Sequence, residues 1–300
     1  MHFAFCILHF LFARKKDNML YFKKTIEYLF KLENGKRFFL LFLIAIPCGI
    51  GVYFTAPTYV YHNWLADFTV GDKSFLSALF FNGHANPLRV LIAGVIVVFV
   101  LMFCISVMAS IVSRNLRVGV FSINRRLMME FNEAIIPSFY AVLMAMLTVI
   151  VGKLILATLI VLFQTINNVV LSAILSTLAL FLNIVLVCYA ISVAILYLPY
   201  MTFNGLRPFV ALAQSANRVG GRVGARMFGA VVVPIVLVYV IGALVGMAKS
   251  FIASIIVESV LYAATLVYLL TLSFVSYYEI NELPREDYPR EYFFTKIKRR

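Results

Sequence analysis

The sequence contains little charge, and least of all negative charge. Only 13% of its 300 residues are Asp, Glu, Lys or Arg, and 63% are hydrophobic, against about 25% and 45–50% in soluble domains. A soluble protein of this length would have too little polar surface to cover so much apolar material. The 26 basic residues outnumber the 13 acidic ones, but they cluster between apolar runs. This placement argues against nucleic acid as a partner and is typical of a membrane protein oriented by Lys and Arg.

Cysteine is scarce, and the four cysteines follow no metal-binding spacing. Cys48, Cys104 and Cys188 lie inside apolar runs, where a thiol behaves as a small hydrophobe. We therefore expect no disulfide framework, with Cys6 included, and no metal site. One loop contains four residues of metal-binding type: His62, Asp67, Asp72 and His84. Their spacing matches no helix-borne pair of ligands, so we interpret them as ordinary polar loop residues.

Catalytic signatures are also missing. The sequence has no GxSxG, no phosphate-binding glycine loop followed by Lys and Ser or Thr, no HExxH and no paired carboxylates within its apolar runs. Gly220, Gly221 and Gly224 lie near Arg218 and Arg222, which suggests phosphate binding only weakly, since close helix packing also favours glycine. We expect no catalytic residues, no cofactor and no enzymatic activity.

The longest uncharged run is the feature around which the chain is organised. Residues 154–206 include no Asp, Glu, Lys or Arg. One bilayer crossing needs about 20 apolar residues of helix, so this run is too long for a single span. The polar, uncharged residues Gln164 to Asn168 divide it. Because backbone groups in lipid must be satisfied within their own segment, the run predicts two helices joined by a tight hairpin.

The whole pattern predicts an all-α fold, a polytopic bundle of six transmembrane helices with short amphipathic helices at the interface. The expected spans are residues 38–56, 90–113, 137–163, 169–199, 227–247 and 251–278. Pro137 suits the first turn of the third span. The predicted organisation is an N-terminal extension with an amphipathic helix (1–37), a membrane domain (38–278) and a basic tail (279–300).

Two amphipathic segments and one loop lie outside the spans. Apolar and basic residues alternate with helical period from Met19 to Lys36, which suits a helix lying on the membrane surface and equally a helix packed on the protein itself. Residues 1–18 reverse the charge order of a signal peptide, and we expect them to be an upstream extension. A second short helix begins at Pro208; its apolar face contains Phe209, Leu212, Ala213 and Ala216. The aromatic-rich loop 57–88 is expected to lie along the membrane.

The distribution of Lys and Arg predicts the orientation. The N-terminal segment, the connections after the second and fourth spans, and the tail together hold 22 of the 26 basic residues. Positive residues favour the cytoplasmic side. We therefore expect both termini in the cytoplasm.

Two kinds of candidate site follow. Lys153 and Glu258 are the two charges least easily explained by a position in a loop. Both are expected to lie inside the bundle, at depths counted from its external face. A lone charge at a helix centre costs about 2.5–3.5 kcal/mol on insertion scales, so we predict an ion pair between them, although Glu258 also suits the outer boundary of its span. The second kind is a set of arginines that either contact anionic lipid headgroups or only set the topology: Arg207, Arg218, Arg222 and Arg226.

The segment between the fourth and fifth spans resembles a known family. Leu198-Pro199, Asn204-Gly205 and Ala211-Leu212-Ala213-Gln214-Ser215 precede a glycine-rich stretch. This segment is similar to uncharacterised bacterial six-helix membrane proteins related to the membrane domain of some glycerophosphodiester phosphodiesterases. The resemblance implies a bacterial plasma membrane and brings no activity with it. Those proteins often place an acidic residue near the position of Asn204, so the role of that charge does not carry over.

Three classes of function remain. Short loops and missing catalytic residues favour a non-enzymatic protein that organises or supports a membrane partner or a lipid process. Its expected partners are membrane lipids, anionic headgroups among them, and a second membrane protein. Pro47, Pro234 and the intramembrane charges instead suggest a small-solute transporter or channel. A lipid-modifying enzyme would need convergent polar residues at one interface, and the sequence does not supply them.

Overall fold

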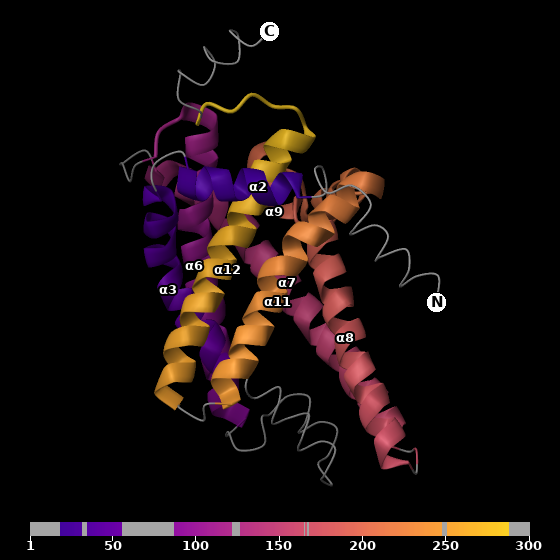
Figure 1. Cartoon of the computed structure of the whole chain (residues 1–300). Coiled ribbons are helices and arrows are strands. Elements are labelled where there is room, and N and C mark those ends of the chain that lie inside the picture. Colours follow the sequence, from indigo (N-terminus) through magenta and orange to yellow (C-terminus); the bar gives the residue numbers. More distant parts are fainter. Residues whose placement is uncertain are drawn as a thin grey trace.

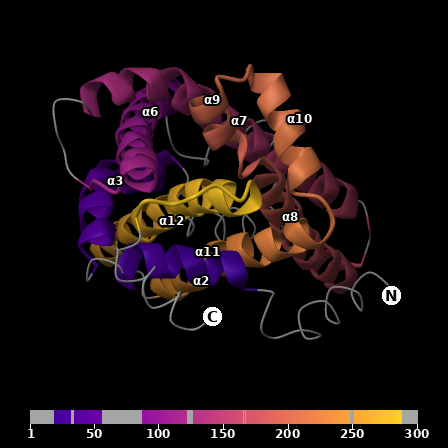
Figure 2. The same cartoon turned by 90° about the horizontal axis from the view of Figure 1, so that it is seen from above.

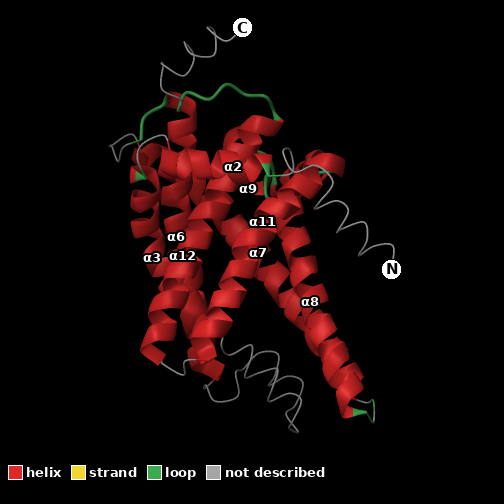
Figure 3. Ribbon diagram, viewed as in Figure 1, coloured by secondary structure: helices red, strands yellow, loops and turns green. Residues whose placement is uncertain are grey.

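The structure is a computed structural model of the chain that describes residues 19–31, 35–55, 87–121, 127–164, 166, 168–247 and 251–287. Every regular element within these ranges is helical, which confirms the predicted all-α class (Figure 3). Residues 1–18 and nearly all of the loop 57–88 lie outside the described residues. The predictions made for the N-terminal extension and for His62, Asp67, Asp72 and His84 therefore stay untested.

Six of the described helices form the body of the molecule (Figure 1). They are α3 (Lys36–Thr55), α6 (Pro87–Val118), α7 (Leu127–Gln164), α8 (Val169–Ala194), α11 (Gly221–Met247) and α12 (Phe251–Ile280). Each belongs to a segment that is long and apolar enough to cross a membrane. The chain is therefore a multi-pass membrane protein.

Contacts between neighbouring helices close the bundle into a ring. Its order is α3, α6, α7, α8, α11, α12 and back to α3. α12 also contacts α6, and the view along the bundle shows α12 between its neighbours (Figure 2). α3 lies very close to α12, because a Cβ added at Gly49 would come within 2.1 Å of the carbonyl oxygen of Ser259. The glycine therefore permits the backbone approach that small residues give membrane helices.

Short helices cover one end of this ring. They are α2 (Leu20–Ile26), which continues into a π-helical turn η1 (Glu27–Lys31), α9 (Tyr197–Asn204) and α10 (Pro208–Arg218). We call this the platform end; α3 begins there and α12 ends there. The opposite end is the hairpin end, where α7 and α8 are joined around Ile166 and where the side chain of Asn168 caps α8 by accepting hydrogen bonds from Val170 and Leu171.

Two helix boundaries differ from the predicted ones. The third span was expected to begin at Pro137, but α7 begins at Leu127 and contains Pro137. The ten residues before the proline include no other helix breaker, so the helix extends through it at the loss of one backbone hydrogen bond. The fourth span was expected to reach Pro199, but α8 ends at Ala194 and Pro199 lies in the first turn of α9. The chain bends where the proline removes a donor.

Candidate functional site

The break between α8 and α9 follows directly from Pro199. A proline in a helix cannot donate to the carbonyl four residues earlier, and its ring crowds that carbonyl. Here the carbonyl belongs to Ile195, which lies between the two helices and is buried. Ser273 of α12 donates a hydrogen bond to this oxygen at 2.5 Å. The serine thus replaces the missing backbone donor and fixes α12 to the break.

Ser215 of α10 satisfies the other free backbone groups of the break. Its hydroxyl donates to the carbonyl oxygen of Val193 at 2.6 Å and accepts from the backbone N–H of Leu196 at 3.2 Å. Ser215 is fully buried. It is also the serine of the motif that carries the family resemblance. In this chain it holds α10 against the end of α8.

Asn204 ends α9 and links it to α12. Its side-chain oxygen accepts a hydrogen bond of 2.7 Å from the hydroxyl of Tyr277. The ring of Tyr277 stacks on Phe203 and lies edge-on to Tyr200. An asparagine at this position therefore acts through its acceptor oxygen, which requires no negative charge.

α10 turns most of its apolar face away from the protein. The face predicted from helical spacing contains Phe209, which is 87% exposed, together with Ala213 and Ala216, which are also exposed. The side that packs on the bundle contains Ala211 and Ser215, both fully buried, and Leu212 of the predicted apolar face is partly buried against the core. An outward apolar stripe is what a helix in the membrane interface presents to the acyl chains.

The four candidate arginines divide into two groups. Arg207 precedes α10, Arg218 ends it and Arg222 lies in the first turn of α11, and all three side chains are exposed. Arg207 and Arg218 are eleven positions apart, about 16 Å of helix, so they mark the two ends of α10. Arg226 is less exposed and lies near Tyr21 of α2. Burial raises the pKa of the Tyr21 hydroxyl, and the charge of Arg226 acts against this rise.

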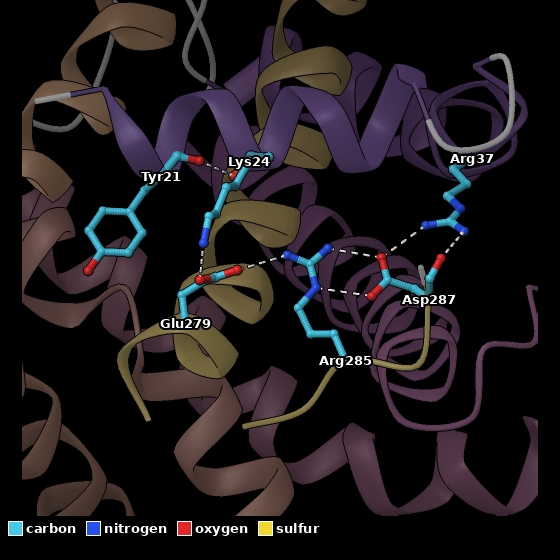
Figure 4. Close-up of polar contacts among 7 residues, drawn as sticks. Tyr21, Lys24, Arg37, Glu279, Arg285 and Asp287 are labelled. Carbon is cyan, nitrogen blue, oxygen red and sulfur yellow. Dashed lines mark hydrogen bonds and ion pairs between the residues drawn. The ribbon is translucent and has the colours of Figure 1, made fainter. Parts of the chain in front are cut away.

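A chain of ion pairs, buried at Arg37, Arg285 and Asp287, crosses the platform end and was not foreseen from the sequence (Figure 4). Lys24 of α2 pairs with Glu279 at the end of α12. Arg285 contacts Glu279 at 3.2 Å and Asp287 at 2.9 Å. Asp287 in turn contacts Arg37 of α3 at 3.3 Å. The network therefore joins both ends of the described chain to the first span.

Residues 281–287, which we call the strap, run back over the bundle within this network. The side chain of Asp287 is 0% exposed, and those of Arg37 and Arg285 are 3% and 4% exposed. The guanidinium of Arg37 lies 4.7 Å from the ring centroid of Tyr28, a cation–π distance. The backbone N–H of Glu286 donates to the carbonyl oxygen of Leu116. The strap is therefore an integral part of the platform, although it belongs to the segment predicted as a tail.

Glu258 lies inside the bundle. It is fully buried, seven positions after the start of α12. The hydroxyl of Tyr268 donates to the carbonyl oxygen of Ala230, and α11 and α12 run antiparallel. Nine positions forward along α11 therefore correspond to nine positions back along α12, so Tyr239 lies at about the level of Ser259. This register places Glu258 level with the C-terminal third of α11.

Lys153 lies at a similar level, although its side chain is outside the described side chains. A Cβ added at the neighbouring Gly152 would come within 3.2 Å of the side-chain oxygen of Asn183 in α8, and Asn183 lines a cavity together with Tyr239. The backbone depths of Lys153 and Glu258 therefore agree. α7 and α12 are not neighbours in the ring, because α6 lies between them on one side and α8 with α11 on the other. The ion pair stays a prediction.

The described residues include no group of three or more His, Cys, Asp or Glu side chains that would hold a metal ion. Cys48, Cys104 and Cys188 are buried thiols. Comparison of the chain with protein-family models, curated proteins and solved structures gave no match. The family resemblance of the segment around Ser215 therefore rests on the residues alone.

Proposed function

We propose that this chain is a non-enzymatic protein of a bacterial plasma membrane that organises anionic lipid at its platform end and thereby supports a lipid process or a membrane partner. The observation that carries the proposal is the orientation of α10. Its apolar face, with Phe209, points outward, and its bundle-facing side is held by Ser215. A helix fixed in this way enters the interface as part of a rigid body.

The exposed arginines supply the attraction to headgroups. Arg207, Arg218 and Arg222 flank the apolar face of α10. A basic residue near an anionic surface contributes about 1 kcal/mol, so three such residues favour anionic over zwitterionic lipid by up to about 3 kcal/mol. Arg226 contributes less in this proposal, because it lies near Tyr21 within the platform.

Lipid binding tests the proposal with a charge-matched control. The purified protein is exchanged into nanodiscs of mixed phosphatidylglycerol and phosphatidylcholine, and the co-retained lipid is quantified by mass spectrometry. The variant Arg207→Gln, Arg218→Gln, Arg222→Gln is expected to lose the enrichment of phosphatidylglycerol. The control Lys23→Gln, Lys31→Gln, Lys36→Gln removes three exposed charges at the same end and is expected to retain it. Equal losses in both variants would contradict a role specific to α10.

The proposed orientation places the platform in the cytoplasm. It is supported by the 22 of 26 basic residues on that side. Reporter fusions after residues 120, 215 and 290 should report a cytoplasmic position, and fusions near 70 and 166 should report an external position. A cytoplasmic signal at residue 70 would overturn this topology.

A small-solute transporter or channel is the second candidate. It is favoured by the cavity next to Asn183 within the bundle and by prolines inside three spans, Pro47, Pro137 and Pro234. Solute flux into liposomes containing the purified protein distinguishes the two functions, because an organising protein gives no flux above protein-free vesicles.

A further inference from the structure

A small cavity lies between α7, α8 and α11, far from the platform. It has a volume of about 50 Å³ and is lined by Val149, Asn183, Ile184, Val187, Ile235 and Tyr239. Asn183 is fifteen positions after the N-cap of α8 and eleven before its last residue, or about 22 Å and 16 Å of helix. The cavity therefore lies near the middle of the span.

Asn183 brings an unmet hydrogen-bond acceptor to this cavity. The residue is 9% exposed, and its side-chain oxygen accepts no hydrogen bond from any described residue. Leaving a buried acceptor without a donor costs about 1–3 kcal/mol. A leucine of similar size would avoid this cost in an apolar span. The amide is therefore best explained by a donor that reaches it through the cavity.

Gly152 shapes the approach to this oxygen from α7. A Cβ at that position would lie 2.9 Å from a methyl group of Val187 and 3.2 Å from the Asn183 oxygen. Any larger residue would press on the amide and on the helix that carries it. The glycine thus lets α7 pack closely on α8 while the acceptor stays accessible at the cavity.

The size and lining of the cavity select the donor. A volume of 50 Å³ leaves room for water, since one water molecule needs about 10–15 Å³ of such volume. Apolar cavities stay dry, but a water is retained where polar groups bind it. Asn183 provides such a group, and Tyr239 adds a second polar side chain to the lining. We propose that the cavity is an intramembrane hydration site in which water donates a hydrogen bond to the side-chain oxygen of Asn183.

Water-edited solid-state NMR tests this site directly, with water as the probe. The full chain, labelled with ¹³C-Asn and ¹³C-Ala, is placed in bilayers of deuterated lipid. The Asn183 signal is assigned by its loss in Asn183→Leu. Exposed Asn204 gives the hydrated reference, and Ala179, one turn before Asn183 and 2% exposed, gives the dry reference; each is assigned by substitution. In the water-edited spectrum the signals of Asn183 and Asn204 are expected to appear, and the signal of Ala179 is expected to be absent. Absence of both the Asn183 and the Ala179 signals from that spectrum would overturn the proposal.

A second variant distinguishes water from the amine of Lys153 as the donor. Lys153 directly follows Gly152, and protons of an ammonium group also exchange with water. In Lys153→Met the water-edited Asn183 signal is expected to persist unchanged. Its loss in that variant, with the Asn204 signal retained, would show that lysine rather than water is the donor and would overturn the proposal.

Discussion

Ser273 donates a hydrogen bond to the carbonyl oxygen of Ile195 across 78 positions of sequence. The bond occupies the acceptor that Pro199 leaves without its helical partner, so a defect in one helix is repaired by another. The same bond fixes α12 to the bend from which α9 and α10 project. The position of α9 and α10 therefore depends on this hydrogen bond as well as on apolar packing.

Replacement of Ser273 by Ala is expected to destabilise the protein by about 1–3 kcal/mol, because it leaves the buried Ile195 carbonyl without a donor. Thermal unfolding in detergent, followed with a thiol-reactive dye, measures the effect. Thr158→Ala is the control, since that hydroxyl bonds within its own exposed helix turn. In the Pro199→Ala background the new backbone N–H at position 199 can donate to the Ile195 carbonyl oxygen. Ser273→Ala should then destabilise the protein less. An unchanged cost in both backgrounds would contradict this account of the break.

Asp287→Asn is expected to destabilise the platform by about 3–5 kcal/mol, because it removes the carboxylate that two buried guanidinium groups, Arg37 and Arg285, share. Limited proteolysis of the strap, together with unfolding midpoints, measures this. Glu27→Gln removes a carboxylate from a pair whose lysine is 76% exposed and should cost less than about 1 kcal/mol. Equal effects of the two substitutions would show that burial of the network contributes nothing.

Gly119→Ala is expected to loosen the strap. Gly119 has a φ of +74°, and a Cβ there would lie 2.6 Å from the carbonyl oxygen of Glu286. Gly205 has a φ of +60° with nothing within 4 Å of its Cβ position. Gly205→Ala should therefore cost only the left-handed backbone penalty of about 1–2 kcal/mol, and Gly119→Ala should cost more. Proteolysis at the strap is expected to rise only in Gly119→Ala; a rise in both would refute the steric explanation.

A double-mutant cycle decides the predicted pair of Lys153 and Glu258. If the charges interact, Lys153→Met and Glu258→Gln should each destabilise the protein, and the double variant should recover part of the loss. The free energies of unfolding in mixed micelles provide the four corners of the cycle. Additive losses would mean that each charge is accommodated independently.

The spans could be predicted because each depends on local composition. Length and hydropathy defined six helices, and the uncharged polar residues before Asn168 identified the hairpin. The break at Ile195 was placed four positions late, at Pro199, because a proline acts on the carbonyl of the preceding turn. The periodicity of α10 identified its apolar face but not whether that face points inward. That direction depends on Ser215 and its partners in another helix.

The ion-pair network was invisible for a different reason. Lys24 and Glu279 are 255 positions apart, and no local pattern distinguishes a charge that pairs across the fold from one that sets topology. Orientation by positive charge accounted for the arginines of the platform as a group. It gave no indication that Arg37 and Arg285 are buried while Arg207 and Arg218 are exposed.

The network has a consequence for how the protein is made. Lys24 and Arg37 leave the ribosome first, but their carboxylate partners, Glu279 and Asp287, follow the last span. During synthesis Lys24 of α2 cannot pair with Glu279 until nearly all of α12 has been translated. Closure of the strap is then a late event in biogenesis, and a nascent chain released before residue 279 would enter the bilayer without the ion pair between α2 and the end of α12.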